Sequence, residues 1–147
     1  MTDTPSPPPA APAERPTVLF VCVKNGGKSQ MAAGLMRQEA GERVAVLSAG
    51  TAPGAGVNAL SAQALLEVDV DIRDQVPRPV TPELVAQADL VVVLGRDAVV
   101  EPHDGTPVVT WDTDEPSERG IDGIERMRLV RDDIARRVGA LVAELAG

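Results

Sequence analysis

The sequence predicts an α/β fold: a small parallel four-stranded sheet flanked by helices on both faces. Short apolar runs without polar alternation, as at residues 18–21 and 90–94, are typical of strands buried on both faces of a parallel sheet. Segments with apolar residues three and four positions apart alternate with these runs. This alternation is expected when helices connect parallel strands by right-handed crossovers.

The first half of the expected sheet surrounds the only cysteine of the chain. We expect a strand over residues 17–23, followed by a helix with Ser29 as its N-cap and Gly41 at its end. The apolar positions of this helix recur at helical spacing. A second short strand over residues 44–47 leads into a loop rich in glycine and proline.

The second half of the chain continues the alternation. A helix is expected over residues 58–68, and a short helix opens at Pro82, because proline fits the first turn of a helix. Residues 90–94 and 108–111 are predicted to form the third and fourth strands. From about residue 121, apolar residues recur every three or four positions, which predicts a long amphipathic C-terminal helix.

Length and composition predict one domain after an unstructured start. The 147 residues are enough for a single hydrophobic core. Residues 1–16 are rich in proline and alanine, and we expect a disordered tail there, followed by one domain over residues 17–147. The apolar stretch after the tail is too short for a signal peptide, and no run approaches the roughly 20 apolar residues of a membrane span.

The charge balance and the cysteine count limit the partners. The formal net charge of −8 argues against nucleic acid, because an acidic surface repels phosphates. A single cysteine excludes an internal disulfide and favours a reducing cytoplasm. We therefore expect a cytoplasmic protein with no membrane partner, no bound cofactor and no cluster with metal-ligand spacing.

The segment over residues 22–29 carries the strongest chemical signal. A strand that ends in the thiol of Cys22 leads through two adjacent glycines into a helix start, which presents unpaired N–H groups and the positive end of a helix dipole. The two lysines of the chain, Lys24 and Lys28, both lie in this loop. The segment therefore predicts a thiolate nucleophile at the floor of a site for a tetrahedral oxyanion.

Two other interpretations of the loop have to be weighed. Gly27-Lys28-Ser29 fits the end of the phosphate-binding loop of nucleotide hydrolases, but Cys22 stands where the first glycine of that motif belongs. No later strand ends in an aspartate suited to hold magnesium. The other interpretation is a buried cysteine that acts only as a small apolar residue. The glycines, lysines and serine after Cys22 argue against it.

The loop resembles that of the low-molecular-weight protein tyrosine phosphatases and of the arsenate reductases that share their fold. Their signature is Cys, five residues, Arg, then Ser or Thr at a helix start. Here the frame is Cys22, five residues, Lys28 and Ser29, with Asn25 at the position of the family's loop asparagine. The match continues in Ser-Ala-Gly-Thr at 48–51, Ala-Asp-Leu-Val-Val-Val at 88–93 and Arg-Leu-Val-Arg-Asp-Asp-Ile at 128–134, and it covers nearly everything from Thr17 onward.

The resemblance implies roles for single residues. Cys22 is the nucleophile, Lys28 binds the oxyanion, and Ser29 stabilises the thiolate. The family's Asp-Pro general acid corresponds to Glu115-Pro116, preceded by Asp114; we favour Glu115, with Asp114 as the alternative. Both acids have a second interpretation, as a cluster that complements the dipole of the last helix. The substrate-binding residues are the remaining loop positions: Val23, Lys24, Asn25, Gly26 and Gly27.

Within the family, the segment Ser-Gln-Met-Ala-Ala at 29–33 resembles the arsenate reductase branch. Phosphatases of this type usually place proline after the serine and aromatic residues beside the acid, whereas this chain has no tyrosine. The substrate implied is a small inorganic oxyanion, arsenate or phosphate, rather than an aryl phosphate.

Two departures from the family affect the mechanism. Lys28 replaces the loop arginine, so the point charge of an ammonium group replaces the bidentate fork of a guanidinium group. If one charge-assisted hydrogen bond is lost, oxyanion binding is weakened by about 1.5–3 kcal/mol. Lys24 is a candidate second cation. The resolving cysteines of thioredoxin-coupled reductases are missing, and residues 95–97 stand where one would lie. Release of arsenite then needs an external thiol; single-cysteine relatives imply mycothiol and a glutaredoxin-like partner.

Three functions follow from these features. The leading one is a single-cysteine arsenate reductase that uses an external low-molecular-weight thiol. The alternatives are a phosphomonoester hydrolase of the low-molecular-weight phosphatase type and a catalytically weakened anion-binding protein. Three other features are expected to be structural: His103 as a solvated loop residue, Trp111 as core or pocket rim, and the arginine series 126, 128, 131, 136 and 137 as a solvated helix face.

Overall fold

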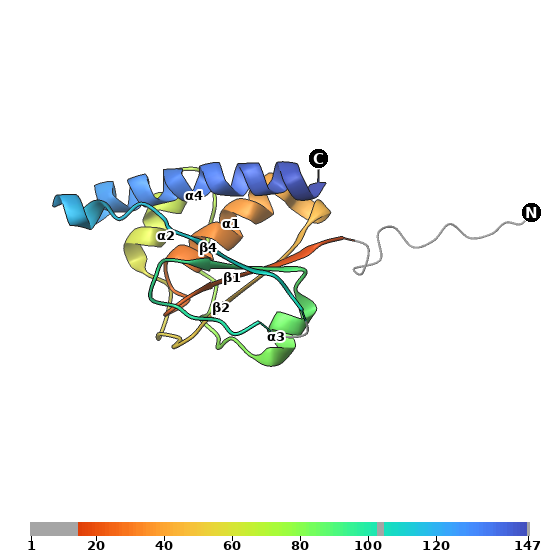
Figure 1. Ribbon diagram of the computed structural model, residues 1–147. Coiled ribbons are helices and arrows are strands. Elements are labelled where there is room, and N and C mark those ends of the chain that lie inside the picture. Colours follow the sequence, from red (N-terminus) through yellow and green to blue (C-terminus); the bar gives the residue numbers. More distant parts are fainter. Residues whose placement is uncertain (1–14, 103–104, 147) are drawn as a thin grey trace, which may run out of the picture.

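Four parallel strands form the sheet of this protein, in the order β2-β1-β3-β4. The computed structural model describes residues 15–102 and 105–146. The strands are β1 (Thr17–Cys22), β2 (Ala45–Gly50), β3 (Leu90–Leu94) and β4 (Val108–Trp111). Helices cover both faces of the sheet, so the predicted α/β architecture is confirmed (Figure 1).

The helices divide unequally between the two faces. One face is covered by α1 (Lys28–Ala40), α2 (Ala59–Leu66) and α4 (Gly123–Ala146), and the other by α3 (Pro82–Gln87) (Figure 1). Two short 3₁₀ turns, η2 (Gly41–Arg43) and η3 (Pro116–Arg119), lie after α1 and before α4.

Because successive side chains of a strand point to opposite faces, β1 contributes to two cores. Val18 and Phe20 pack with the α1–α2–α4 face, whereas Leu19 and Val21 pack with the α3 face, and all four are fully buried. Ile134 on α4 is also fully buried in the first core. Because β1 is buried on both faces, its last residue, Cys22, is held in place at the carboxyl edge of the sheet.

Several predicted element boundaries are confirmed by side-chain caps. Asn58 accepts the N–H of Ser61 at the start of α2, and Thr81 accepts the N–H of Leu84 just before Pro82 opens α3. Gly41 follows α1 with a positive φ of 57°, as expected for a helix-ending glycine.

Most element ends lie within one or two residues of the prediction, and two larger differences affect the site. The second strand continues through residues 48–50 because these pair in register with the end of β1, with Gly50 opposite Cys22. The prediction of Ser29 as N-cap is wrong: α1 begins at Lys28 after Gly27, and Ser29 lies buried in the first turn. Its hydroxyl faces the thiol of Cys22 instead of the helix end.

Part of the expected N-terminal tail, residues 1–14, lies outside the described residues, as does His103. At the edge of the described part, the Pro16 carbonyl accepts a hydrogen bond of 2.8 Å from the Ala45 N–H. Within residues 15–102 and 105–146, no helix has the length and apolar character that crossing a bilayer requires.

The packing of α4 on the sheet predicts a large loss of stability when its buried side chains are shortened. We expect Ile134→Ala to lower the free energy of unfolding by about 2–5 kcal/mol, because the surrounding core cannot collapse fully into the cavity. Val99→Ala is the matched control, since Val99 is 74% exposed, and it should change the value by no more than about 0.5 kcal/mol. Urea unfolding followed by circular dichroism measures both, and equal losses would contradict this account of the core.

Candidate active site

Cys22 lies at the carboxyl end of β1, between β2 and β3. Its sulfur lies 3.0 Å from Ser29 Oγ and receives the backbone N–H of Asn25 at 3.2 Å. Both donors come from the loop that closes over the strand end. Two polar groups therefore face the sulfur from the residues that directly follow β1.

Asn25 organises the floor of the loop. It is fully buried and has a positive φ of 54°, a left-handed conformation that asparagine tolerates better than most residues. Its Nδ2 donates to Ser29 Oγ at 2.8 Å, and its Oδ1 accepts the Arg78 N–H at 3.0 Å. Because Ser29 Oγ already accepts from Asn25, its own hydrogen is left for the sulfur of Cys22.

The carbonyl groups of the loop are held from behind by the segment that follows β2. Four backbone N–H groups of this segment donate to carbonyl groups of the loop. The pairs are Thr51 to Cys22 at 3.1 Å, Ala52 to Val23 at 2.8 Å, Gly54 to Lys24 at 2.9 Å and Asn58 to Gly26 at 2.7 Å. Glycine is required where the two segments meet. A Cβ on Gly50 would lie 2.6 Å from the Val23 carbonyl oxygen, and one on Gly26 would lie 2.7 Å from the Gly56 oxygen.

The N–H groups of the same loop remain available. Within residues 15–102 and 105–146, no group accepts a hydrogen bond from the backbone N–H of Gly26, Gly27 or Lys28. Free N–H groups at a helix start form an anion site, and here they follow directly after the thiol. This geometry disfavours the interpretation of Cys22 as a purely structural residue.

Lys28 and Glu115 form an ion pair across the site. Arg126, in the first turns of α4, extends this pair: its Nη2 lies 3.9 Å from the second carboxylate oxygen of Glu115. Partial burial and then the charge of Arg126 lower the pKa of Lys28, while the charges of Cys22, Asp97 and Asp112 oppose the shift. The carboxylate of Glu115 therefore lies between two cations that repel each other.

Asp114 lies beside Glu115 in the chain but faces another partner. Its carboxylate accepts two hydrogen bonds from Arg119, at 2.7 and 3.1 Å. This pairing lowers the pKa of Asp114, which suits a permanent anion and not a proton donor. The geometry favours Glu115 as the acid that faces the loop. Both carboxylates precede α4, which begins at Gly123, in the sequence, and each is paired with an arginine side chain.

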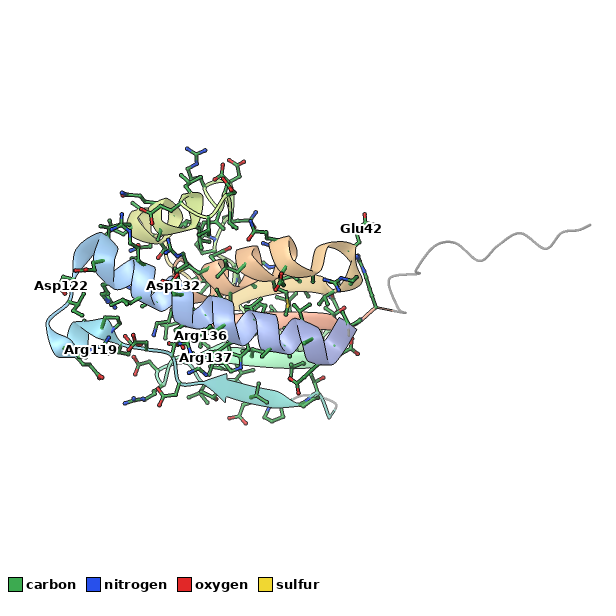
Figure 2. All side chains as sticks on the ribbon, turned by 90° about the horizontal axis from the view of Figure 1, so that it is seen from above. Glu42, Arg119, Asp122, Asp132, Arg136 and Arg137 are labelled. Carbon is green, nitrogen blue, oxygen red and sulfur yellow. The ribbon has the colours of Figure 1, made fainter. Side chains whose placement is uncertain are left out.

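The C-terminal helix holds the segment that carries both acids. Asp133 is buried and accepts the Asp114 N–H at 2.9 Å, and Arg137 donates to the Asp112 carbonyl at 2.9 Å. Arg136 and Arg137 both donate to the Asp133 carboxylate and lie along the middle of α4 on the side of the sheet's β4 edge (Figure 2). The position of Glu115 is thus fixed from α4.

A cavity of about 500 Å³ opens beside the loop. Lys24, which is exposed, lies at its wall together with Lys28 and Arg126, and Met31, Met127 and Val130 form an apolar side. The described residues contain no cluster of three or more His, Cys, Asp or Glu side chains that could hold a metal ion.

The prediction that the arginines of α4 form a solvated face is wrong for two of them. Arg126 lines the cavity, and Arg131 is only 12% exposed, donating to the Ala64 carbonyl and to Glu67. Sequence reasoning therefore missed Arg126. A signal was present: residues 126, 130 and 134 are four apart, so Arg126 shares a helix face with the buried Val130 and Ile134.

The segment where a resolving cysteine was considered lies next to the loop. A Cβ on Gly95 would be 3.7 Å from Lys28 Nζ, and Arg96 pairs with Asp112. No second thiol is available there, because Cys22 is the only cysteine in the sequence.

Comparisons with known proteins agree with this geometry. The profile of the low molecular weight phosphotyrosine protein phosphatase family matches residues 17–147. Arsenate reductase 2 of Staphylococcus saprophyticus is 33% identical over 132 residues, covering 85% of this chain and 95% of the relative. A thioredoxin-dependent arsenate reductase of Corynebacterium glutamicum is 31% identical with a TM-score of 0.75, covering 90% of this chain and 62% of that chain.

A third relative is an arsenate reductase solved in its phosphate-binding state. It is 28% identical with a TM-score of 0.76, and the match covers 88% of this chain and 98% of that one.

The left-handed conformation and the side-chain bonds of Asn25 can be separated by two substitutions. We expect Asn25→Gly to lower the free energy of unfolding by about 1–3 kcal/mol, because the Arg78 N–H and Ser29 Oγ lose buried partners. Asn25→Ala should cost about 1 kcal/mol more, since alanine is also strained at positive φ. Urea unfolding measures both, and equal stability of the two variants would argue against a strained backbone at this position.

Proposed function

The chain belongs to the low molecular weight phosphotyrosine protein phosphatase family, and we propose that it works as a single-cysteine arsenate reductase that uses an external thiol. The observation that carries the proposal is the position of Cys22: its sulfur receives two hydrogen bonds at the floor of a loop whose next N–H groups are free. Relatives with names of this activity span the whole domain, which supports arsenate as the oxyanion.

In the first step, the thiolate of Cys22 attacks the arsenic of arsenate. An S–As bond forms while the bond from arsenic to its hydroxyl group breaks, and this hydroxyl takes one proton from the carboxyl of Glu115 and leaves as water. Lys28 and the free N–H groups of the loop hold the remaining oxygens. This step requires the protonated form of the Glu115 carboxyl, because that carboxyl donates the proton.

In the second step, an external thiolate attacks the sulfur of Cys22. The S–As bond breaks, and its electron pair reduces arsenic from the +5 to the +3 state, so that arsenite leaves and a mixed disulfide remains on Cys22. A second thiol molecule then displaces Cys22 and restores the enzyme. Both reducing thiols come from outside, because the chain has no second cysteine.

The reductant can be identified from the mass of the protein. We expect arsenate reduction with a low-molecular-weight thiol such as mycothiol, aided by a glutaredoxin-like protein, and a Cys22 mixed disulfide that forms only when arsenate is present. Intact-mass spectrometry detects the adduct, and Cys22→Ser should abolish both the adduct and turnover. Turnover with thioredoxin as the only reductant would contradict the predicted external thiol.

The two neighbouring acids make a matched pair of variants. We expect Glu115→Gln to lower the rate of arsenate reduction by about 100-fold or more, because the leaving oxygen loses its proton donor. The same change should tighten phosphate binding, because it removes the carboxylate that pairs with Lys28. Asp114→Asn, which disrupts the pair with Arg119, is the control, and a larger loss of rate in this variant would assign the acid to Asp114.

A second candidate function is phosphomonoester hydrolysis, which the solitary cysteine favours because hydrolysis needs no second thiol. Aryl phosphate hydrolysis without added thiol, abolished by Cys22→Ser, would support it. Lys28→Arg tests whether the site is a weakened enzyme. A gain of about ten-fold or more in either activity is expected from the added hydrogen bond. No activity in either form would instead support an anion-binding protein.

A further inference from the structure

Arg126 reaches the site from an element far from the loop in sequence. It lies on α4, nearly one hundred positions after Lys28, yet both side chains line the same cavity. Its Nη2 is 3.9 Å from Glu115 Oε2, while Lys28 contacts Glu115 Oε1. The carboxylate of Glu115 is thus the anion that both cations share.

The guanidinium of Arg126 has unused hydrogen-bonding capacity. Its Nε is buried and has no hydrogen-bond partner within the residues that the structure describes. An unsatisfied buried donor costs free energy, and a buried arginine is usually paired in a bidentate manner. The neighbouring arginines on the helix differ: Arg128 and Arg131 both donate to the carboxylate of Glu67.

The electrostatics of the pair point to an exchangeable anion. Partial burial, and then the positive charge of Arg126, lower the pKa of Lys28. Two partly buried cations are stable next to each other only with an anion between them. A carboxylate and a tetrahedral oxyanion both present oxygens that accept such donors, so either can fill the position.

We propose that Arg126 is an oxyanion-binding residue of this site and supplies, from α4, the guanidinium that Lys28 lacks within the loop. In the unliganded protein, the carboxylate of Glu115 pairs with Lys28 and Arg126. When the oxyanion binds, it replaces Glu115 as their partner, and Glu115 turns to the leaving oxygen. This inference deepens the proposed function and rests on it for the identity of the substrate. The binding step itself holds for any tetrahedral oxyanion.

The test measures phosphate binding, which is independent of reduction. Phosphate should protect Cys22 from alkylation by iodoacetamide, and intact-mass spectrometry gives the apparent Kd because no other cysteine reacts. We expect Arg126→Gln to raise this Kd by about ten-fold or more, as for loss of one charge-assisted contact. Arg126→Lys should raise it less, because it keeps the charge and loses the fork.

The matched control is Arg128→Gln, which removes the same charge from the same helix but pairs with Glu67 outside the site. It should change the Kd by less than about three-fold. Repeating Arg126→Gln in the Glu115→Gln background separates direct contact from an effect through Glu115, and the loss of affinity should persist there. Equal Kd values for Arg126→Gln and Arg128→Gln, or a loss that vanishes without Glu115, would overturn the proposal.

The same measurements distinguish this inference from the proposed function. Protection by phosphate that depends on Arg126, in a protein that does not reduce arsenate with any thiol, would refute the reductase and leave the binding role intact. Arsenate reduction with an unchanged KM in Arg126→Gln would refute the binding role of Arg126 and leave the proposed reductase function intact.

Discussion

The candidate site depends on the conformation of one buried residue, Asn25. In its left-handed backbone conformation, Asn25 turns its N–H toward the sulfur of Cys22 and its amide toward Ser29 and Arg78. One residue thereby joins the end of β1, the first turn of α1 and the chain that precedes α3. These hydrogen bonds hold the loop in one conformation, so less of a ligand's binding free energy is spent on ordering it.

The second constraint is electrostatic. The protein as a whole is acidic, with a net charge of −8, yet the site gathers Lys24, Lys28 and Arg126 around one cavity. A local cluster outweighs the distant field because solvent screens charges beyond about 10 Å. Glu115 keeps this cluster neutral enough to be stable without substrate. In the proposed mechanism the same carboxyl is also the acid, which would link binding of the oxyanion to protonation of the leaving group.

Local signals in the sequence were sufficient for most of the fold. The strands over residues 90–94 and 108–111, and the helix starts at Asn58 and Thr81, depend on short apolar runs and on caps that lie within a few positions. The extension of β2 to Gly50 was not predictable, because Ser48, Ala49 and Gly50 have no strand pattern and are ordered by pairing with β1.

The loop of the candidate site was predictable from the sequence, whereas the contacts that distant elements make with it were not. The loop from Cys22 to Ser29 was recognisable because its residues are contiguous in the sequence. The inward orientation of Ser29, however, depends on Cys22 and Asn25, which come within hydrogen-bond distance of it only in the folded loop. Arg126 was missed because alternation with acids suggests a solvated face, whereas the start of α4 lies beside the loop. The four-residue spacing from Arg126 to the buried Val130 and Ile134 indicates an inward face, but the contact with Glu115 depends on how the helix is placed over the sheet.

The pair formed by Phe20 and Trp111 has a spectroscopic consequence. Their rings lie 5.7 Å apart and are tilted by 53°, and the sequence contains no other tryptophan and no tyrosine. Intrinsic tryptophan fluorescence therefore comes from one position at the end of β4, four residues before Glu115. Because the Thr113 N–H donates to the Trp111 carbonyl, the fluorophore lies directly before the segment that carries Asp114 and Glu115, and its emission is an optical probe of this region without a label.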